Sequence, residues 1–205
     1  MDWLILLLVG CVGYLIGKGN DARYKISDSE REIAEIIASQ INPTNEVLIN
    51  NVTLRLPDGR TTQIDHILIS QYGVYAIETK DYRGWIFGNG KSETWTQVIY
   101  KRKSTFQNPL RQNYYHTKAL EELFDFLPKG AIKSLVIFTD KSEFKTEMPN
   151  NVINSQDIPK FLSSRNEELI SLNRIQFCLG RLTFYRLPES YDTDRMHVHN
   201  LRNRI

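Results

Sequence analysis

The sequence predicts one mixed α/β domain whose elements follow the order helix, three strands, helix, strand and helix. Three observations predict this fold class. A helical pattern of isoleucines comes first, three short segments with alternating apolar and polar residues follow, and a second amphipathic helix separates them from a further β-rich run. The chain has 205 residues, of which 41% are hydrophobic and 24% charged. It can therefore bury one core of ordinary size, whereas two domains would both be small.

The first elements are a helix and an antiparallel meander of three strands. Residues 27–41 place apolar side chains at helical spacing, begin at residues suited to cap a helix and end before an Asn-Pro pair. Residues 47–56 alternate between apolar and polar side chains and end at a Pro-Asp-Gly turn. Residues 61–70 and 74–80 are two more strands with a tight loop between them.

The second half of the chain supplies one clear helix, one buried strand and several weaker elements. An Asn-Pro pair opens the helix, and the later strand is a short run rich in β-branched residues. An irregular or hairpin-like excursion, rich in Gly, Asn and aromatic residues, precedes the helix. The expected elements are the excursion at 81–97, a short strand at 96–100, the helix at 108–127, the strand at 133–139 and weaker helices at 157–164 and 167–175.

The first residues differ from the rest of the chain. Residues 3–17 read WLILLLVGCVGYLIG and carry no charge. A hydrocarbon core of about 30 Å needs roughly 20 helical residues, so we expect this short run to span a membrane with help from its flanks or from local thinning. A cleaved signal peptide is an alternative, although no basic residue precedes the run. Lipidation of Cys11 is another.

Basic residues after the apolar run predict an orientation. They place the rest of the chain in the cytoplasm by the positive-inside rule. We therefore expect a single-pass membrane protein with residues 1–18 as the anchor and 19–26 as a linker. Gly13 and Gly17 form a small-residue pair that would let two spans pack as a homodimer, although glycines are common in membrane helices in any case.

Polar side chains on the second and third strands form the candidate site. A four-residue loop at 70–73 fixes the antiparallel register so that Asp65 faces Glu78. The same register sets Gln63 opposite Lys80. Facing residues share one side of a sheet, as do residues two apart on one strand. The sequence thus predicts a square of four polar side chains on one face.

Two carboxylates in this setting favour a bound cation. The neighbouring residues are those of a buried sheet, where an ionised carboxylate costs free energy unless it has a partner. Facing carboxylates repel, and one would keep its proton unless a cation neutralised both. Mg²⁺ or Mn²⁺ takes oxygen ligands and keeps several waters, and Lys80 would then hold a water or stabilise charge on a phosphate. The alternative is a buried ion-pair network without chemistry.

Several motifs resemble one known family. They are IDHILIS at 64–70, GVYAIETK at 73–80, Gly84, Trp95 and NPLRQNYYH at 108–116. Their order is similar to that of the nuclease-related domain, a branch of the PD-(D/E)xK nuclease superfamily. The resemblance covers about residues 27–126 and implies a restriction-endonuclease-like αβββαβ core. We expect that domain to occupy residues 27–188 and to leave 189–205 as a polar tail.

The resemblance implies a role for each residue of the motif. Asp65 and Glu78 would be metal ligands, the backbone carbonyl of Thr79 would be a third ligand, and Lys80 would be the catalytic lysine. Glu30 in the first helix matches the family's helical glutamate and would complete the metal site. The residue before it is serine, where glycine is more usual in the family, so the neighbouring Glu32 stays an alternative to Glu30.

Other residues are assigned from the second helix and the second strand. Gln112 matches a family glutamine near the site and is counted with the catalytic residues. His116 lies one helical turn later on the same face, where it would meet the substrate. His66 alternates with Asp65 along its strand, so we expect a buried histidine held by hydrogen bonds rather than a ligand.

We therefore expect a nuclease that uses Mg²⁺ or Mn²⁺ to hydrolyse phosphodiester bonds of nucleic acid, with DNA favoured over RNA. The alternative from another class is a catalytically silent module with the same fold that binds nucleic acid or a protein partner. The formal charge of +2 gives no global attraction to a polyanion, so local residues must provide the contacts. The candidates for nucleic-acid contact are Gln63, Lys101, Arg102, Lys103, Arg111 and His116.

Overall fold

The structure is a computed structural model that describes residues 26–202. Residues 26–187 form one compact unit, and residues 188–202 belong to another. The second unit contains helix α6 (Tyr191–Arg202), in a segment whose polarity suggested a tail. Every candidate site residue lies in the first unit.

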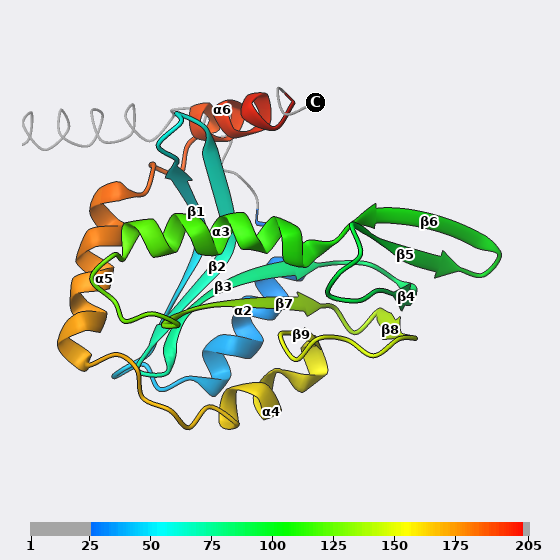
Figure 1. The fold of residues 1–205 in the computed structure, drawn as a ribbon, viewed down its shortest axis with the longest axis horizontal. Coiled ribbons are helices and arrows are strands. Elements are labelled where there is room, and N and C mark those ends of the chain that lie inside the picture. The colour runs from blue at the N-terminus through cyan, green and yellow to red at the C-terminus, as the bar shows by residue number, and fades with distance from the viewer. Residues whose placement is uncertain (1–25, 203–205) are drawn as a thin grey trace, which may run out of the picture. The chain divides into compact units, whose positions relative to one another are not determined.

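The main sheet of the first unit has five strands in the order β1-β2-β3-β7-β9 (Figure 1). Strands β1 to β3 form the antiparallel meander that the sequence predicts, and β7 and β9 extend it with parallel pairings. The expected mixed α/β class is confirmed, with a mixed sheet consistent with a nuclease-like core. The strands are β1 (Val47–Arg55), β2 (Thr61–Ser70), β3 (Gly73–Lys80), β7 (Ile132–Phe138) and β9 (Val152–Asn154).

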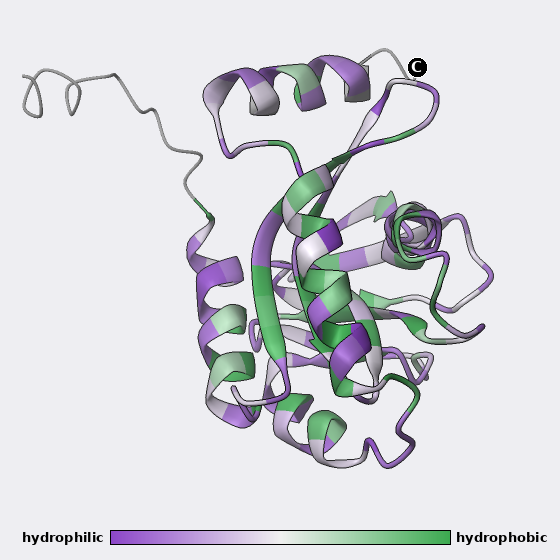
Figure 2. Ribbon diagram, turned by 90° about the vertical axis from the view of Figure 1, so that its left-hand side faces the viewer, coloured by the Kyte–Doolittle hydropathy of each residue, from purple (hydrophilic) through white to green (hydrophobic). Residues whose placement is uncertain are grey.

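Helices cover both faces of this sheet. Helices α3 and α5 pack on one face, over a core that includes Ile67 and Leu120. Helices α2 and α4 pack on the other face, over Leu68 and Ile77. Figure 2 shows hydrophobic residues along the strands and both colours on the helices, as expected when each helix buries one side. The helices are α2 (Asp28–Gln40), α3 (Pro109–Leu123), α4 (Ile158–Ser163), which follows a 3₁₀ turn (Ser155–Asp157), and α5 (Leu172–Tyr185).

The starts of α2 and α3 are set by local capping. Ser27 and Glu30 form a capping box, in which the Ser27 hydroxyl accepts from the Glu30 N–H and the Glu30 carboxylate accepts from the Ser27 N–H. Asn108 caps α3 through its side chain, and Pro109 follows at the first helical position, where the missing N–H has no cost. Sequence patterns of this kind explain why both helices begin where they were expected.

A second sheet of four strands, in the order β6-β5-β4-β8, includes the segment 81–97 that the sequence predicted to be an irregular or hairpin-like excursion. Trp95 and Ile86 of this sheet share a core with Phe138 of β7, which attaches the second sheet to the first. The expected strand at 96–100 overlaps β5, but β6 and the long β5–β6 hairpin were not expected. The strands are β4 (Gly84–Phe87), β5 (Thr94–Ile99), β6 (Arg102–Gln107) and β8 (Ser142–Phe144).

One expected helix differs from the structure. Residues 167–175 showed a helical pattern, yet α5 begins only at Leu172. The backbone N–H groups of Leu169 and Ile170 both donate to the carbonyl of Gln71, at 2.7 and 3.0 Å. Ile170 is buried in the core below α5. This tertiary contact, which local periodicity does not report, keeps the segment extended.

The expected membrane anchor, residues 1–18, lies outside the residues that the structure describes. Between residues 26 and 202, no helix combines the length and the apolar character needed to cross a membrane. The predicted placement as a single-pass membrane protein is therefore wrong for residues 26–202, which the structure describes.

Candidate functional site

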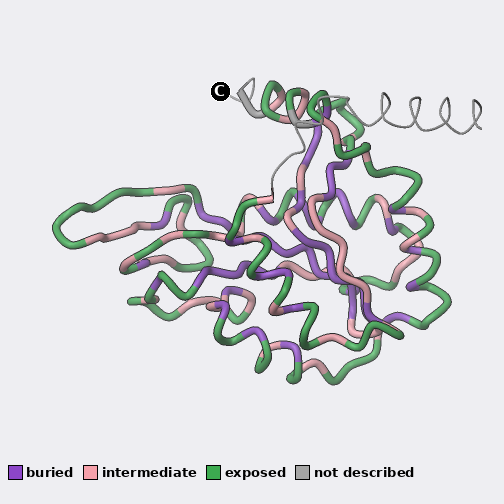
Figure 3. Tube along the Cα trace, turned by 180° about the vertical axis from the view of Figure 1, so that it is seen from behind, coloured by how far each residue is buried: buried purple, intermediate pink, exposed green. Residues whose placement is uncertain are grey.

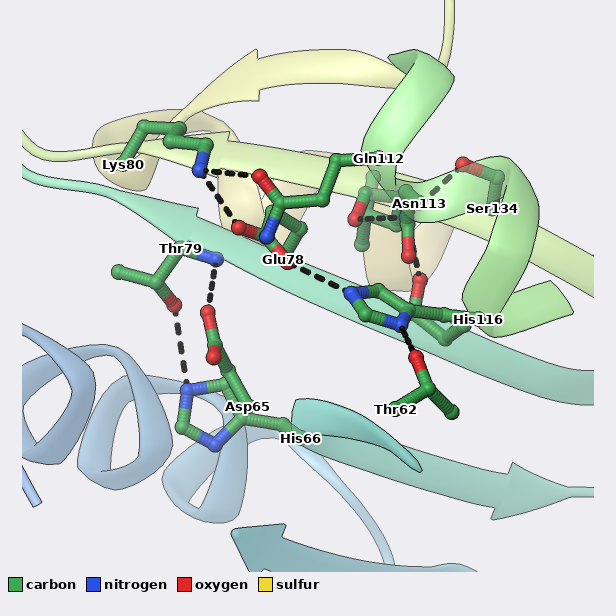
Figure 4. Close-up of polar contacts among 12 residues, drawn as sticks. Thr62, Asp65, His66, Glu78, Thr79, Lys80, Gln112, Asn113, His116 and Ser134 are labelled. Carbon is green, nitrogen blue, oxygen red and sulfur yellow. Dashed lines mark hydrogen bonds and ion pairs between the residues drawn. The ribbon is translucent and has the colours of Figure 1, made fainter. Parts of the chain in front are cut away.

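The register of β2 and β3 is the one that the sequence predicts. Ile69 faces Val74, and the pairing continues to His66 opposite Ile77. The ladder ends there. Beyond its end, the carboxylate of Asp65 accepts a hydrogen bond from the backbone N–H of Thr79 at 2.7 Å (Figure 4). The two strands therefore separate at the point where the candidate acids lie.

The alternation of side chains resets at this point of β1 and β2. Ile64 and Ile67, three residues apart on β2, belong to the same core beneath α3 and α5, although a regular strand would turn them to opposite faces. The cause lies in the facing strand β1, where Asn51 has a left-handed φ of 52°. This conformation is uncommon for a residue other than glycine, and asparagine is among those that tolerate it best.

The reset breaks the predicted square of polar side chains. Gln63 donates to the Asn51 side chain at 2.6 Å instead of facing Lys80. Thr62, which strict alternation would place away from Glu78, bonds to the ring of His116 at 2.7 Å. The prediction of the square assumed regular strands, and the pattern of apolar and polar residues does not indicate a left-handed residue inside β1.

Asn51 offers a stability test of this reset. We expect Asn51→Val to lower the free energy of unfolding by about 2–3 kcal/mol, because a β-branched residue in the left-handed region is strained and the bond from Gln63 is lost. Asn51→Gly should cost only about 1 kcal/mol, since glycine adopts this φ freely. Urea unfolding curves compare the two, and an equal loss in both variants would show that the left-handed φ is not the constraint.

Glu78 is the centre of the polar network. Its side chain is 3% exposed, and its carboxylate accepts from the Lys80 ammonium at 2.6 Å and contacts His116 Nε2 at 3.1 Å. Lys80 also donates to the side-chain oxygen of Gln112 at 2.9 Å. A chain of contacts therefore runs from Gln112 through Lys80, Glu78 and His116 to Thr62 (Figure 4).

His116 is a buried hydrogen-bond partner of Glu78 and does not face the solvent, where a substrate would bind. The residue is 4% exposed, so the expected contact with nucleic acid does not fit its position. A neutral ring satisfies both neighbours when Nε2 donates to Glu78 and Nδ1 accepts from the Thr62 hydroxyl. Gln112, assigned from the resemblance, and His116, assigned from the helical spacing, both bond to residues of β3. The spacing did not indicate that His116 would be buried.

The two carboxyl groups have opposite pKa shifts. Burial alone would raise the pKa of Glu78, but the hydrogen bond from His116 and the charge of Lys80 outweigh it and lower that pKa. Burial and the negative charge of Glu78 raise the pKa of Asp65 well above its usual value, and Glu30 adds to this, whereas the Thr79 N–H opposes it. Negative charge around Asp65 is therefore not fully compensated by protein groups.

The donors around this point fit a hard divalent cation. Asp65 and Glu78 supply carboxylate oxygens from neighbouring strands. Because a residue in a strand directs its N–H and C=O to the same side, the Thr79 carbonyl points toward β2, as its N–H does. Mg²⁺ needs only one or two carboxylates and keeps several waters. A bound cation would offset the burial and the negative charge that raise the pKa of Asp65.

The acidic groups do not, however, form a ready cage. Within residues 26–202, no group of three or more His, Cys, Asp and Glu side chains gathers closely enough to hold a metal. Glu78 turns toward the α3 residues, whereas Asp65 turns toward the β3 backbone. Glu30 is close enough for its charge to act on Asp65, but its carboxylate is bonded to the Ser27 N–H.

Asn113 fixes α3 against the sheet and was not singled out from the sequence. Its buried amide nitrogen lies within hydrogen-bond distance of the carbonyls of Ala76 and Leu135 and the Ser134 hydroxyl, at 2.8 to 3.1 Å (Figure 4). These contacts join α3 to β3 and β7. Since Gln112 precedes Asn113 directly, the same contacts hold Gln112 over Lys80.

His66 is a buried residue with both ring nitrogens bonded, as the sequence predicted. Nδ1 contacts the Asn50 side chain at 2.9 Å, and Nε2 contacts the Thr79 hydroxyl at 3.2 Å. Burial lowers the pKa of His66 to about 4. The ring is therefore neutral near pH 7 and braces β2 against β3 beside Asp65.

The expected nucleic-acid contacts fall into two groups. Lys101, Arg102 and Lys103 are exposed at the end of the β5–β6 hairpin. Arg111, also exposed, pairs with Glu93 at 2.9 Å. Gln63 is partly exposed and bonds to Asn51, whereas His116 is buried and offers no surface for nucleic acid.

Comparison with known proteins identifies a family and a relative. Residues 25–139 match the family model of the nuclease-related domain, a range that includes every residue of the network described above. An uncharacterised protein of Bacillus anthracis is 30% identical over 212 residues, and the alignment covers 98% of this chain and 95% of that protein.

Proposed function

This chain belongs to the nuclease-related domain family, and on that premise we propose that it is a metal-dependent nuclease that hydrolyses phosphodiester bonds of DNA. The observation that carries the proposal is that Asp65, Glu78 and Lys80 all lie where β2 and β3 separate. The two acids lie on adjacent strands, close enough for the charge of Glu78 to act on Asp65, and an ammonium group is bonded to Glu78. Carboxylates that hold a metal ion and a positioned ammonium group can together assist phosphodiester hydrolysis.

Asp65, Glu78 and the Thr79 carbonyl would hold Mg²⁺ or Mn²⁺. When bound, the ion would supply positive charge at the phosphate and a more acidic water. Glu30 would reach this point only after leaving its bond to the Ser27 N–H, so we propose it as an outer ligand that acts through water.

Lys80 has the geometry of a positioned cation. An ammonium has three N–H donors, of which Glu78 and Gln112 each accept one. The remaining donor can orient a water or a phosphate oxygen. Because both partners restrict the side chain, little reorganisation is needed when negative charge develops in the transition state. Gln112 is thus proposed as a positioning residue, since it acts through Lys80.

The first test is the dependence on metal. We expect the purified protein to cleave DNA in Mg²⁺ or Mn²⁺, to lose this activity in excess EDTA and to regain it when Mn²⁺ is restored. Cleavage of defined single- and double-stranded substrates is followed on denaturing gels. Activity that persists in EDTA would reject the metal-dependent mechanism, and absence of cleavage in Mn²⁺ beside an active control nuclease would reject the function.

A second candidate function is a catalytically silent module that binds nucleic acid. The lack of a three-residue metal cluster in residues 26–202 favours it, as does the compensation of Glu78 by Lys80 and His116. Such a module would bind DNA equally well after Asp65→Ala and would cleave nothing. A binding assay run beside the cleavage assay separates the two functions.

A further inference from the structure

The β5–β6 hairpin extends away from the five-stranded sheet and the helices that cover it (Figure 1). The two strands pair from Thr94 opposite Gln107 to Ile99 opposite Arg102. β6 is an edge strand, because only β5 pairs with it. Most of β6 and the whole tip are exposed (Figure 3). A two-stranded ribbon of this kind is only marginally stable without partners, so its outer part adds little to the core.

The tip carries a concentrated positive charge. Lys101, Arg102 and Lys103 are consecutive and exposed. Among the residues that the structure describes, none of the three forms an ion pair, whereas Arg111 at the base of the hairpin pairs with Glu93. The charge at the tip is therefore available to a polyanion, even though the whole chain is nearly neutral.

Tyr100 occupies the turn with an exposed side chain and an unfavourable backbone conformation. The residue is 98% exposed, and its φ of 53° lies in the left-handed region. Glycine or asparagine would fit this position at lower free energy. An aromatic ring held in water on a strained backbone contributes no packing, and such outliers point to a functional constraint.

The hairpin is joined directly to the candidate site. β6 ends at Gln107, Asn108 caps α3, and the first turns of α3 carry Gln112 to Lys80. Six strand residues rise about 20 Å in all, so the tip lies roughly that far from the base of α3. On B-form DNA this length corresponds to about six base pairs.

We propose that the β5–β6 hairpin is an arm that enters the major groove of duplex DNA, with Lys101, Arg102 and Lys103 on the phosphates and Tyr100 in the groove. The major groove of B-DNA is wide enough for a two-stranded ribbon, whereas the corresponding groove of A-form RNA is deep and narrow. The inference rests on the proposed function only for the substrate class. It names double-stranded DNA as the form that this chain binds.

The test is duplex binding without metal, so that cleavage plays no part. Fluorescence anisotropy in EDTA compares the wild type with a variant carrying Lys101→Ala, Arg102→Ala and Lys103→Ala, on a duplex of about 20 base pairs. A matched control carries Lys129→Ala, Lys160→Ala and Arg174→Ala, which remove the same charge from exposed positions on the loop before β7, on α4 and on α5.

The arm variant is expected to reduce the slope of log K against log salt by about three, one for each phosphate contact. Its affinity at 0.1 M salt should fall on the order of 100-fold, while the control keeps the wild-type slope. Tyr100→Gly should weaken duplex binding although it unfolds at the same or a higher temperature, because glycine relieves the left-handed φ. A merely structural role for Tyr100 predicts no change in binding.

Three results would overturn the arm: a wild type that does not bind the duplex, an arm variant that binds like the control, or an equal dependence on these residues with single-stranded DNA or duplex RNA. Hydrolysis of bis(p-nitrophenyl) phosphate by the wild type in Mn²⁺ reports separately on the proposed function, since this substrate is too small to need a groove. Duplex binding that depends on the arm residues, without any hydrolysis, would support the proposed role of the hairpin and reject the proposed nuclease function.

Discussion

Glu78→Gln is expected to reduce Mn²⁺-dependent cleavage of duplex DNA by about 10³-fold or more, with the fold retained. The substitution keeps the size of the side chain but removes the charge that would bind the ion and that holds Lys80 at 2.6 Å. Removing one positioned electrostatic group in an active site costs about 10²- to 10³-fold, and here two groups are affected. Asp65→Asn and Lys80→Met should each lose at least about 10²-fold.

The cleavage assay uses rates under single-turnover conditions, so that weaker DNA binding is not mistaken for slower chemistry. Glu35→Gln is the matched control, because Glu35 is an exposed glutamate on α2. It should cleave at the wild-type rate. Retention of most activity in Glu78→Gln would remove Glu78 from the mechanism and leave the silent module as the better account.

His116→Ala is expected to have the largest effect on stability, lowering the free energy of unfolding by about 3 kcal/mol or more. The change leaves a carboxylate that is 3% exposed with one hydrogen bond fewer and removes the partner of the Thr62 hydroxyl. Buried polar groups left unsatisfied cost about 1–3 kcal/mol each, and charged groups cost more. Urea unfolding measures the loss.

A double-mutant cycle separates this effect from simple loss of volume. In a Glu78→Gln background, His116→Ala should cost clearly less, because no buried charge remains to be satisfied. Lys118→Ala serves as the control, since Lys118 is an exposed neighbour on α3 that pairs with Glu121 and lies over the Tyr114 ring at the surface. Equal losses from His116→Ala in both backgrounds would show that the histidine matters for packing and not as a partner of Glu78.

The register of the site could be predicted because local signals determine it. The loop between β2 and β3 and the buried pattern of both strands allow one antiparallel pairing, and this pairing brings Asp65 and Glu78 to adjacent strands. The capping residues Ser27 and Asn108 likewise predicted the starts of α2 and α3. In each case the deciding interaction spans only a few residues of sequence.

The rest of the site depends on contacts that the pattern does not contain. The left-handed Asn51 resets the alternation of β1 and β2, so Thr62 and not Gln63 joins the network. Asn113 docks α3 through distant carbonyls. The β5–β6 hairpin was missed because its outer strand is exposed on both faces and lacks the apolar alternation of a half-buried strand.

The claim on which the whole account depends is that Asp65 and Glu78 bind one divalent cation together. Calorimetric titration of Mn²⁺ into the purified protein tests this without any substrate. We expect one ion to bind per chain, and Asp65→Asn and Glu78→Gln each to abolish the binding heat, while Glu35→Gln leaves it unchanged. Absence of Mn²⁺ binding by the wild type, or equal binding by all three variants, would contradict the account.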